Sequence, residues 1–195
     1  MRKTNMKQLI IYILLSMSIT AFNDPPFKER QLRYERVSNA YKEKEEKIKQ
    51  MLKSKGVDYS GLQIFIRAFK REQLLEVYAK TNKESKFTLL TEYKFCTLSG
   101  ELGPKRKQGD MQVPEGFYHI ERFNPPSSFH LSLGINYPNA SDKILSGKRN
   151  PGGDIFIHGN CVSIGCIPIT DDLIKELYIV CVEAKSKGQK QIPVH

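Results

Sequence analysis

The 195-residue chain carries 31 lysine and arginine residues against 21 aspartate and glutamate residues, a formal net charge of +10, and no tryptophan. A chain of this length can bury the core of one domain without disulfide or metal staples. Residues 1–21 hold three bases and no acid, residues 27–55 hold ten bases and five acids, and Asp24 lies between them, so a net charge of +3 remains from Gly56 onward. A nucleic-acid-binding domain would spread its positive charge over the fold, so we expect no nucleic-acid partner.

Residues 1–21 have the pattern of a secretory signal peptide. Basic residues precede an apolar run at 9–15, and small residues follow as far as Ala21. The alternative is a membrane anchor, but the uncharged run is shorter than the about 20 residues that a spanning helix needs. We therefore predict cleavage near Ala21, a location in the periplasm or cell envelope, and membrane contact only through the signal peptide.

Residues 22–60 are predicted to form a linker and an N-terminal helix. Asp24-Pro25-Pro26 has the composition of a linker, and apolar residues then recur at helical spacing among glutamates and lysines until Gly56. The helix either packs on the outside of the domain or binds a partner, and the sequence does not distinguish these two roles.

From Gly61 onward, apolar residues alternate with polar residues at a period of two, which indicates β-strands. Runs at 62–69, 74–79 and 87–97 predict an antiparallel meander, and further strands are expected at 117–121 and 129–133. The intervening loops at 99–110 and 134–153 are long, and long loops often form the walls of a site. Thr170 can cap a helix that ends near Gly188, and 192–194 reads as a last extended segment. The pattern predicts a mainly β (α+β) domain over residues 61–195.

A short stretch, residues 152–168, combines the residues needed for nucleophilic catalysis. Ile155-Phe156-Ile157 reads as a buried strand that ends at His158, and a loop of small residues leads to Gly165-Cys166. An imidazole within reach of a thiol can take its proton and leave a thiolate. The glycine before Cys166 leaves backbone N–H groups unobstructed, which suits an oxyanion hole.

Asp154 is not expected to complete a triad. It precedes His158 by four residues, which is roughly 13 Å along a strand at ~3.3 Å per residue. We expect a backbone carbonyl, that of Gly159, to orient the imidazole instead.

The run His158-Gly-Asn-Cys-Val-Ser-Ile-Gly-Cys166 resembles the active-site signature of the L,D-transpeptidase catalytic-domain (YkuD) family, and its spacing is most similar to the YafK-like branch. The resemblance extends from about Leu62 to the C-terminal helix, through residues 114–120 and 129–139. Ile164 and Pro168 stand where many members carry basic residues, which leaves the substrate and the acyl acceptor open.

The resemblance implies a β-sandwich-like core, with one helix before it and one after the active-site loop, and cysteine-dependent acyl transfer on peptidoglycan peptide stems. It implies no cofactor and no metal. Cys166 would be the nucleophile, His158 the general acid and base, Gly159 the backbone group that orients His158, and Gly165 part of the oxyanion hole. The residues expected near the substrate are His130, Tyr137, Asn160 and Ser163, although Asn160 and Ser163 can equally shape the loop.

The outcome of the implied reaction is open between a cross-link, a protein attachment and hydrolysis of a murein-linked envelope protein. Two alternatives of other kinds are a non-catalytic protein that binds murein and a general cysteine peptidase. The sequence leaves the oligomeric state undetermined.

The other three cysteines are expected to have structural roles. Cys96 and Cys181 are expected in the core, one on a strand and one on an apolar helix face. Cys161 could join His158 and Cys166 in a zinc site, but no second ligand pair of the usual spacing is visible. A Cys161–Cys166 disulfide would disable the nucleophile, so we expect Cys161 to be packed away from Cys166.

Overall fold

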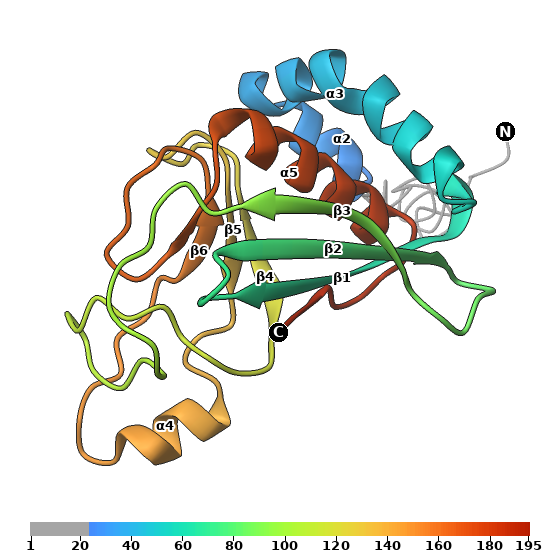
Figure 1. The fold of residues 1–195 in the computed structure, drawn as a ribbon. Helices are drawn as coiled ribbons and strands as arrows, with labels where there is room; N and C mark the ends of the chain where they lie inside the picture. Colours follow the sequence, from blue (N-terminus) through green and yellow to red (C-terminus); the bar gives the residue numbers. More distant parts are fainter. Residues whose placement is uncertain (1–23) are drawn as a thin grey trace, which may run out of the picture.

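The computed structural model describes residues 24–195, so the predicted signal peptide lies outside the described residues. Helices α2 (Phe27–Leu32), α3 (Glu35–Ser54) and α5 (Asp171–Ser186) lie together over one side of the meander β1–β3, whereas α4 (Ala140–Ser146) lies apart from them (Figure 1). Within residues 24–195, none of the helices combines the length and apolar character that crossing a membrane requires.

Eight strands form one mixed sheet in the order β3-β2-β1-β8-β4-β5-β6-β7. Most neighbours are antiparallel, but β8 runs parallel to β1, and β7 runs parallel to β6. The strands are β1 (Leu62–Phe69), β2 (Leu74–Thr81), β3 (Thr88–Lys94), β4 (Tyr118–Asn124), β5 (Ser132–Ile135), β6 (Phe156–His158), β7 (Ile167–Pro168) and β8 (Pro193–Val194).

The predicted α+β class and the antiparallel meander of β1, β2 and β3 are confirmed. The fifth strand begins three residues later than predicted because His130 has a positive φ of 67°, which interrupts an extended run. The predicted loop 134–153 contains α4, whose first turn is closed by a capping box between Asn139 and Asp142.

The predicted N-terminal helix is two helices, because Tyr34 adopts an extended conformation (φ −85°, ψ 124°) between α2 and α3. The apolar stripe of α3 packs against α5, with Val37, Ile48 and Leu52 buried. The interface also holds carboxylates of α5: Glu183 accepts from Tyr41 at 2.8 Å and pairs with Lys28 at 2.6 Å. The stripe is therefore used for packing within the chain.

Helix α5 is the element that ties these layers together. Thr170 caps it by accepting from the Leu173 N–H, as predicted, and the helix is buried over most of its length. It packs against β1, β5, β6 and both N-terminal helices. Because α5 follows β7 directly, its placement also fixes where the loop between β6 and β7 ends.

Candidate active site

The loop that carries the predicted nucleophile connects two parallel strands. The register pairs Ile157 of β6 with Ile167 of β7, which places Cys166 beside Phe156. Alternation along β6 puts Phe156 and His158 on the same face of the strand. The short strands therefore bring the thiol and the imidazole to one side of the sheet.

Cys166 and His158 both line a pocket with a volume of about 430 Å³, here called the His158 pocket. Cys166 is a free cysteine, partly exposed, and its S–H donates weakly to the Asp154 carbonyl at 3.7 Å. The remaining walls come from the end of β4, the start of β5 and the segment between them, from β6 and the residues just before it, and from the active-site loop: Asn124, Ser127, Ser128, Phe129, Ser132, Asp154, Phe156, Val162, Ser163 and Ile164.

His158 is held in one orientation. Its Nδ1 lies 2.5 Å from the Gly159 carbonyl oxygen, and its ring packs against Phe129 with centroids 4.8 Å apart. With Nδ1–H donating to that carbonyl, Nε2 is the nitrogen that can accept a proton. The side chain is 2 % exposed, and this burial lowers the pKa of the imidazole below 6.5, which keeps the ring neutral near neutral pH.

The thiol of Cys166 also rests in its neutral form. Burial raises its pKa above the ordinary value, and the negative charge of Asp154 raises it further, while the Phe156 N–H and Lys105 act in the opposite direction. Both groups on the walls of this pocket are therefore neutral, and thiolate formation would need proton transfer from the thiol to the imidazole.

A second pocket, with a volume of about 510 Å³, reaches Cys166 from the other side and is here called the Gly152 pocket. Asp154, Ile164 and Cys166 line both pockets. Its walls come from two loops and include Lys105, Gln108, Gly109, Met111, Gly152, Gly153 and Ile155. The nucleophile can therefore be approached from two directions.

Ser163 shapes the loop around the nucleophile. Its Oγ donates to the Cys166 carbonyl at 2.8 Å and accepts from the Gly165 N–H at 3.1 Å. The N–H of Gly165, expected to serve an oxyanion, is thus engaged within the loop. Gly165 is required for another reason: its φ is +129°, and a Cβ there would lie 3.0 Å from the Gln112 carbonyl oxygen.

Of the four residues expected near the substrate, Ser163 alone lines one of the two pockets at Cys166. The Asn160 N–H donates to Asp171 at 2.7 Å, which anchors the loop to α5. Tyr137 is buried, and its hydroxyl donates to the Pro151 carbonyl at 3.0 Å. His130 belongs to neither pocket, and its backbone carbonyl accepts from Arg36 of α3 at 2.7 Å. These three residues support the walls.

A disulfide joins Cys96, just after β3, to Cys161 in the active-site loop. The expectation that Cys96 is an ordinary core residue is therefore wrong, whereas Cys181 is buried and free as expected. Cys161 is kept apart from Cys166, and the zinc alternative loses one of its three ligands. A hydrogen bond between the hydroxyls of Ser99 and Ser163, at 3.0 Å, adds a second link between the same two segments.

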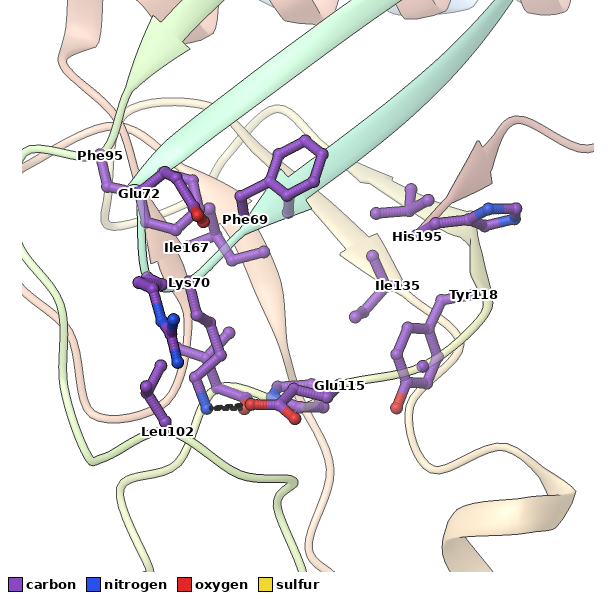
Figure 2. A pocket seen from close by; sticks show the side chains of 16 residues that line it. Phe69, Lys70, Glu72, Phe95, Leu102, Glu115, Tyr118, Ile135, Ile167 and His195 are labelled. Atoms are coloured by element: carbon purple, nitrogen blue, oxygen red, sulfur yellow. Dashed lines mark hydrogen bonds and ion pairs between the residues drawn. The ribbon is translucent and has the colours of Figure 1, made fainter.

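Another pocket, of about 280 Å³, lies against β1 and β8 and is lined by neither His158 nor Cys166 (Figure 2). Lys70 reaches across it, pairs with Glu115 at 3.1 Å, and donates to the carbonyls of Gly103 and Val113 at 2.7 and 3.0 Å. Lys70 thus fastens the segment that continues into the Gly152 pocket. There Lys105 and Asp110 form a buried ion pair at 2.6 Å.

Several site residues were missed from the sequence. Phe129 was assigned to a strand, and nothing in a single aromatic side chain indicates that it contacts an imidazole. Asp154 has a positive φ of 56° and lies outside β6, so its distance from His158 could not be judged by strand spacing. The partner of Asp154 is Arg122 of β4, which pairs with it at 2.6 Å across 32 positions of sequence.

Comparison with known proteins places this arrangement in a family. The model of the L,D-transpeptidase catalytic domain, YkuD, matches residues 63–191. YafK of Escherichia coli strain K12 is 38 % identical over 136 residues, which are 69 % of this chain and 53 % of YafK; YafK of Escherichia coli O157:H7 matches equally. The chain thus spans about half the length of these curated relatives.

Solved structures agree with the sequence relatives. The helical cell shape determining protein Pgp2 from Campylobacter jejuni superposes with a TM-score of 0.53 and 26 % identity, over 68 % of this chain and 46 % of Pgp2. Its K307A mutant gives the same TM-score and identity over 70 % and 47 %. The family and branch predicted from the His158–Cys166 motif are confirmed. The chain belongs to the L,D-transpeptidase catalytic domain (YkuD) family.

Proposed function

We propose that the protein is a cysteine acyltransferase of the cell envelope that acts on the peptide stems of peptidoglycan. Membership of the L,D-transpeptidase catalytic domain family supports the substrate class. The single observation that carries the chemistry is a free thiol, Cys166, and an oriented imidazole, His158, on the walls of one open pocket.

The first half of the reaction forms a thioester. His158 Nε2 takes the proton of the Cys166 thiol, and the thiolate attacks the carbonyl carbon at the L-centre of the stem's diamino acid. The C–N bond to the leaving group breaks, and the departing amine receives the proton from the imidazolium. The backbone N–H of Cys166 is our candidate oxyanion donor, and one such donor contributes about 3 kcal/mol in comparable sites.

The second half resolves the thioester. An acceptor amine or water gives its proton to His158 and attacks the same carbonyl carbon, and the Cys166 sulfur leaves as a thiolate that is then reprotonated. An amine yields a cross-link or an attached protein, and water yields hydrolysis, including release of a murein-linked envelope protein. The two pockets that meet at Cys166 support an arrangement in which the acyl donor and the acceptor approach from different sides.

Two experiments test the proposal. In the first, purified protein is incubated with isolated sacculi and with a defined tetrapeptide stem, and the products are identified by mass. We expect cleavage or exchange of the bond after the diamino acid. This activity should be lost in Cys166→Ala and retained in Cys181→Ala. Exposure to a carbapenem-type acylating agent should leave an adduct on Cys166. Binding to sacculi without products and without an adduct would instead favour the non-catalytic murein-binding protein, and activity on unfolded casein but not on sacculi would favour a general peptidase.

A further inference from the structure

An exposed ion pair stands beside the nucleophile. Arg122 Nη2 lies 2.6 Å from Asp154 Oδ1, and the two side chains are 50 % and 79 % exposed. An ion pair this exposed contributes little to stability, because water solvates both charges when it opens. Each charge can therefore exchange its partner for an oppositely charged group of a ligand at small cost.

Asp154 belongs to the lining that the two pockets share, and its partner Arg122 lies next to a wall of one of them; the two residues are here called the rim pair. Asp154 lines both pockets, and its carbonyl accepts from the Cys166 thiol at 3.7 Å, so covalent geometry keeps its carboxylate within roughly 9 Å of the sulfur. Arg122 lies over the Phe156 ring at 4.6 Å from the centroid, and Phe156 is a wall of the His158 pocket. A negative group in the shared lining and a positive group paired with it thus lie near the reacting sulfur.

The proposed substrate presents the complementary charges, so this inference rests on the proposed function. When the diamino acid of a stem is attacked at its L-centre, its other end remains a free amino acid with one ammonium and one carboxylate. Three methylene groups separate the two centres, a span of about 5 Å between α-carbons. That free end can reach the rim pair while the attacked carbonyl lies at the sulfur.

We propose that Arg122 and Asp154 are the specificity element of the site and bind the free amino-acid end of the diamino acid, the carboxylate on Arg122 and the ammonium on Asp154. Binding replaces one ion pair by two, each between charged hydrogen-bonding groups of complementary geometry.

The test compares three tetrapeptide stems as acyl donors at a fixed concentration of one acceptor. One stem contains meso-diaminopimelate, one contains lysine and lacks the free carboxylate, and one contains 2-aminopimelate and lacks the ammonium. We expect wild-type kcat/KM to favour the first stem by about tenfold over each of the others. Asp154→Asn should abolish the preference over the 2-aminopimelate stem, and Arg122→Gln should abolish the preference over the lysine stem.

Arg67→Gln is the matched control, because Arg67 is similarly exposed and pairs with Glu76 on β1 and β2, which β8, β4 and β5 separate from β6. It should keep all wild-type preferences. Unchanged preferences in both rim variants would overturn the assignment. If wild type processes none of the three stems, the proposed function itself fails, and the wild-type measurement shows this separately.

Discussion

At the scale of single residues, the proposed chemistry depends on two groups that burial keeps uncharged. His158 packs against Phe129, and Cys166 lines two pockets. The same desolvation lowers the pKa of the imidazole and raises the pKa of the thiol. The active form of the free protein is therefore the neutral pair over a wide range of pH.

This predicts a broad pH profile. The acid limb of kcat/KM reports protonation of His158 and should lie below pH 6.5, because burial lowers its pKa. The basic limb reports loss of the Cys166 proton and should lie above pH 9, because burial and Asp154 raise its pKa. Initial rates with a tetrapeptide stem across this range measure both limbs. An acid limb above pH 7 would show that His158 is more readily protonated than its surroundings allow.

Gly159 has no space for a side chain. A Cβ there would lie 2.5 Å from the Asp171 carboxylate and 3.0 Å from both Ile174 and the Phe129 carbonyl oxygen. We expect Gly159→Ala to lower stability by about 1–3 kcal/mol through overpacking, and to reduce kcat because the carbonyl that holds His158 moves. Thermal unfolding and initial rates give the two readouts.

Gly153→Ala is the matched control for this prediction, since a Cβ at Gly153 meets no atom within 4 Å and its φ is not in the left-handed region. It should leave stability unchanged. If Gly159→Ala also had wild-type stability and kcat, the close approach of α5 to the His158-Gly159 segment would have no consequence for the site.

At the scale of elements, the active-site loop is fastened to other segments at three positions. The Asn160 N–H is bound by Asp171 of α5, Cys161 is bonded to Cys96 after β3, and Ser163 contacts Ser99. The segment 159–165 would otherwise be a loop of small residues joining two very short strands. The disulfide is therefore the strongest restraint on where Cys166 is presented.

Removing the disulfide should lower the free energy of unfolding by about 2–4 kcal/mol, since it closes a long loop in the unfolded chain. Cys96→Ser and Cys161→Ser should destabilise to a similar extent, and the double variant should cost no more than either, because both changes remove one bond. Denaturant unfolding of the three variants measures this. Additive effects would show that the two cysteines do not act as a pair.

Thiol titration gives an independent check on the disulfide. The unreduced, unfolded chain should contain two reactive thiols, those of Cys166 and Cys181, out of four cysteines in the sequence. Four reactive thiols before any reductant is added would contradict the disulfide.

The elements show what a single sequence can and cannot predict here. Strand β1 was predicted with its observed bounds because alternation is a local signal, and the Thr170 cap located α5. Helix α4 was missed although Asn139 and Asp142 have the spacing of a capping box, since the preceding Tyr137-Pro138 suggested a loop. The disulfide partners are 65 positions apart and the β1–β8 pairing is more distant still, so no local pattern could reveal either.

In the candidate site, too, the compact motif could be predicted from the sequence, and contacts between distant segments could not. His158 and Cys166 were predicted because their motif is compact, and the structure brings both to one pocket. The structural role of Tyr137 could not be foreseen, because it depends on a hydrogen bond to Pro151 in another segment. A loop-shaping role was expected for Asn160, but no local pattern indicates its partner, Asp171 of α5. The importance of Arg122 depends on a partner on a different element, and the sequence gives no signal for such a pairing.

At the scale of the whole molecule, the N-terminal helices and the catalytic part share one core. Val37, Ile48 and Leu52 of α3 belong to the same buried cluster as Ile157 of β6 and Leu177 of α5. Ion pairs cross the same interface, with Lys47 of α3 against the buried Glu176 of α5 at 2.5 Å. The described residues should therefore unfold as one cooperative unit.

Ile48→Ala tests whether the described residues unfold as one cooperative unit. Ile48 is fully buried in α3, so its truncation should cost about 2–5 kcal/mol. Ile48→Ala should lower the midpoint of denaturant unfolding by the same amount whether unfolding is followed by helical circular dichroism or by alkylation of Cys166. Helical signal lost at lower denaturant than protection of Cys166 would show that α2 and α3 unfold separately from the site.

The central claim is that Cys166 carries the acyl group of the substrate, and direct observation of the covalent intermediate tests it most closely. The purified protein is mixed with a tetrapeptide stem, quenched in acid at short times, digested and mapped by mass spectrometry. We predict an acyl group on the peptide that contains Cys166, formed more slowly in His158→Gln and absent in Cys166→Ala. Turnover of the stem by Cys166→Ala at the wild-type rate, or an acyl group on another residue, would contradict the account.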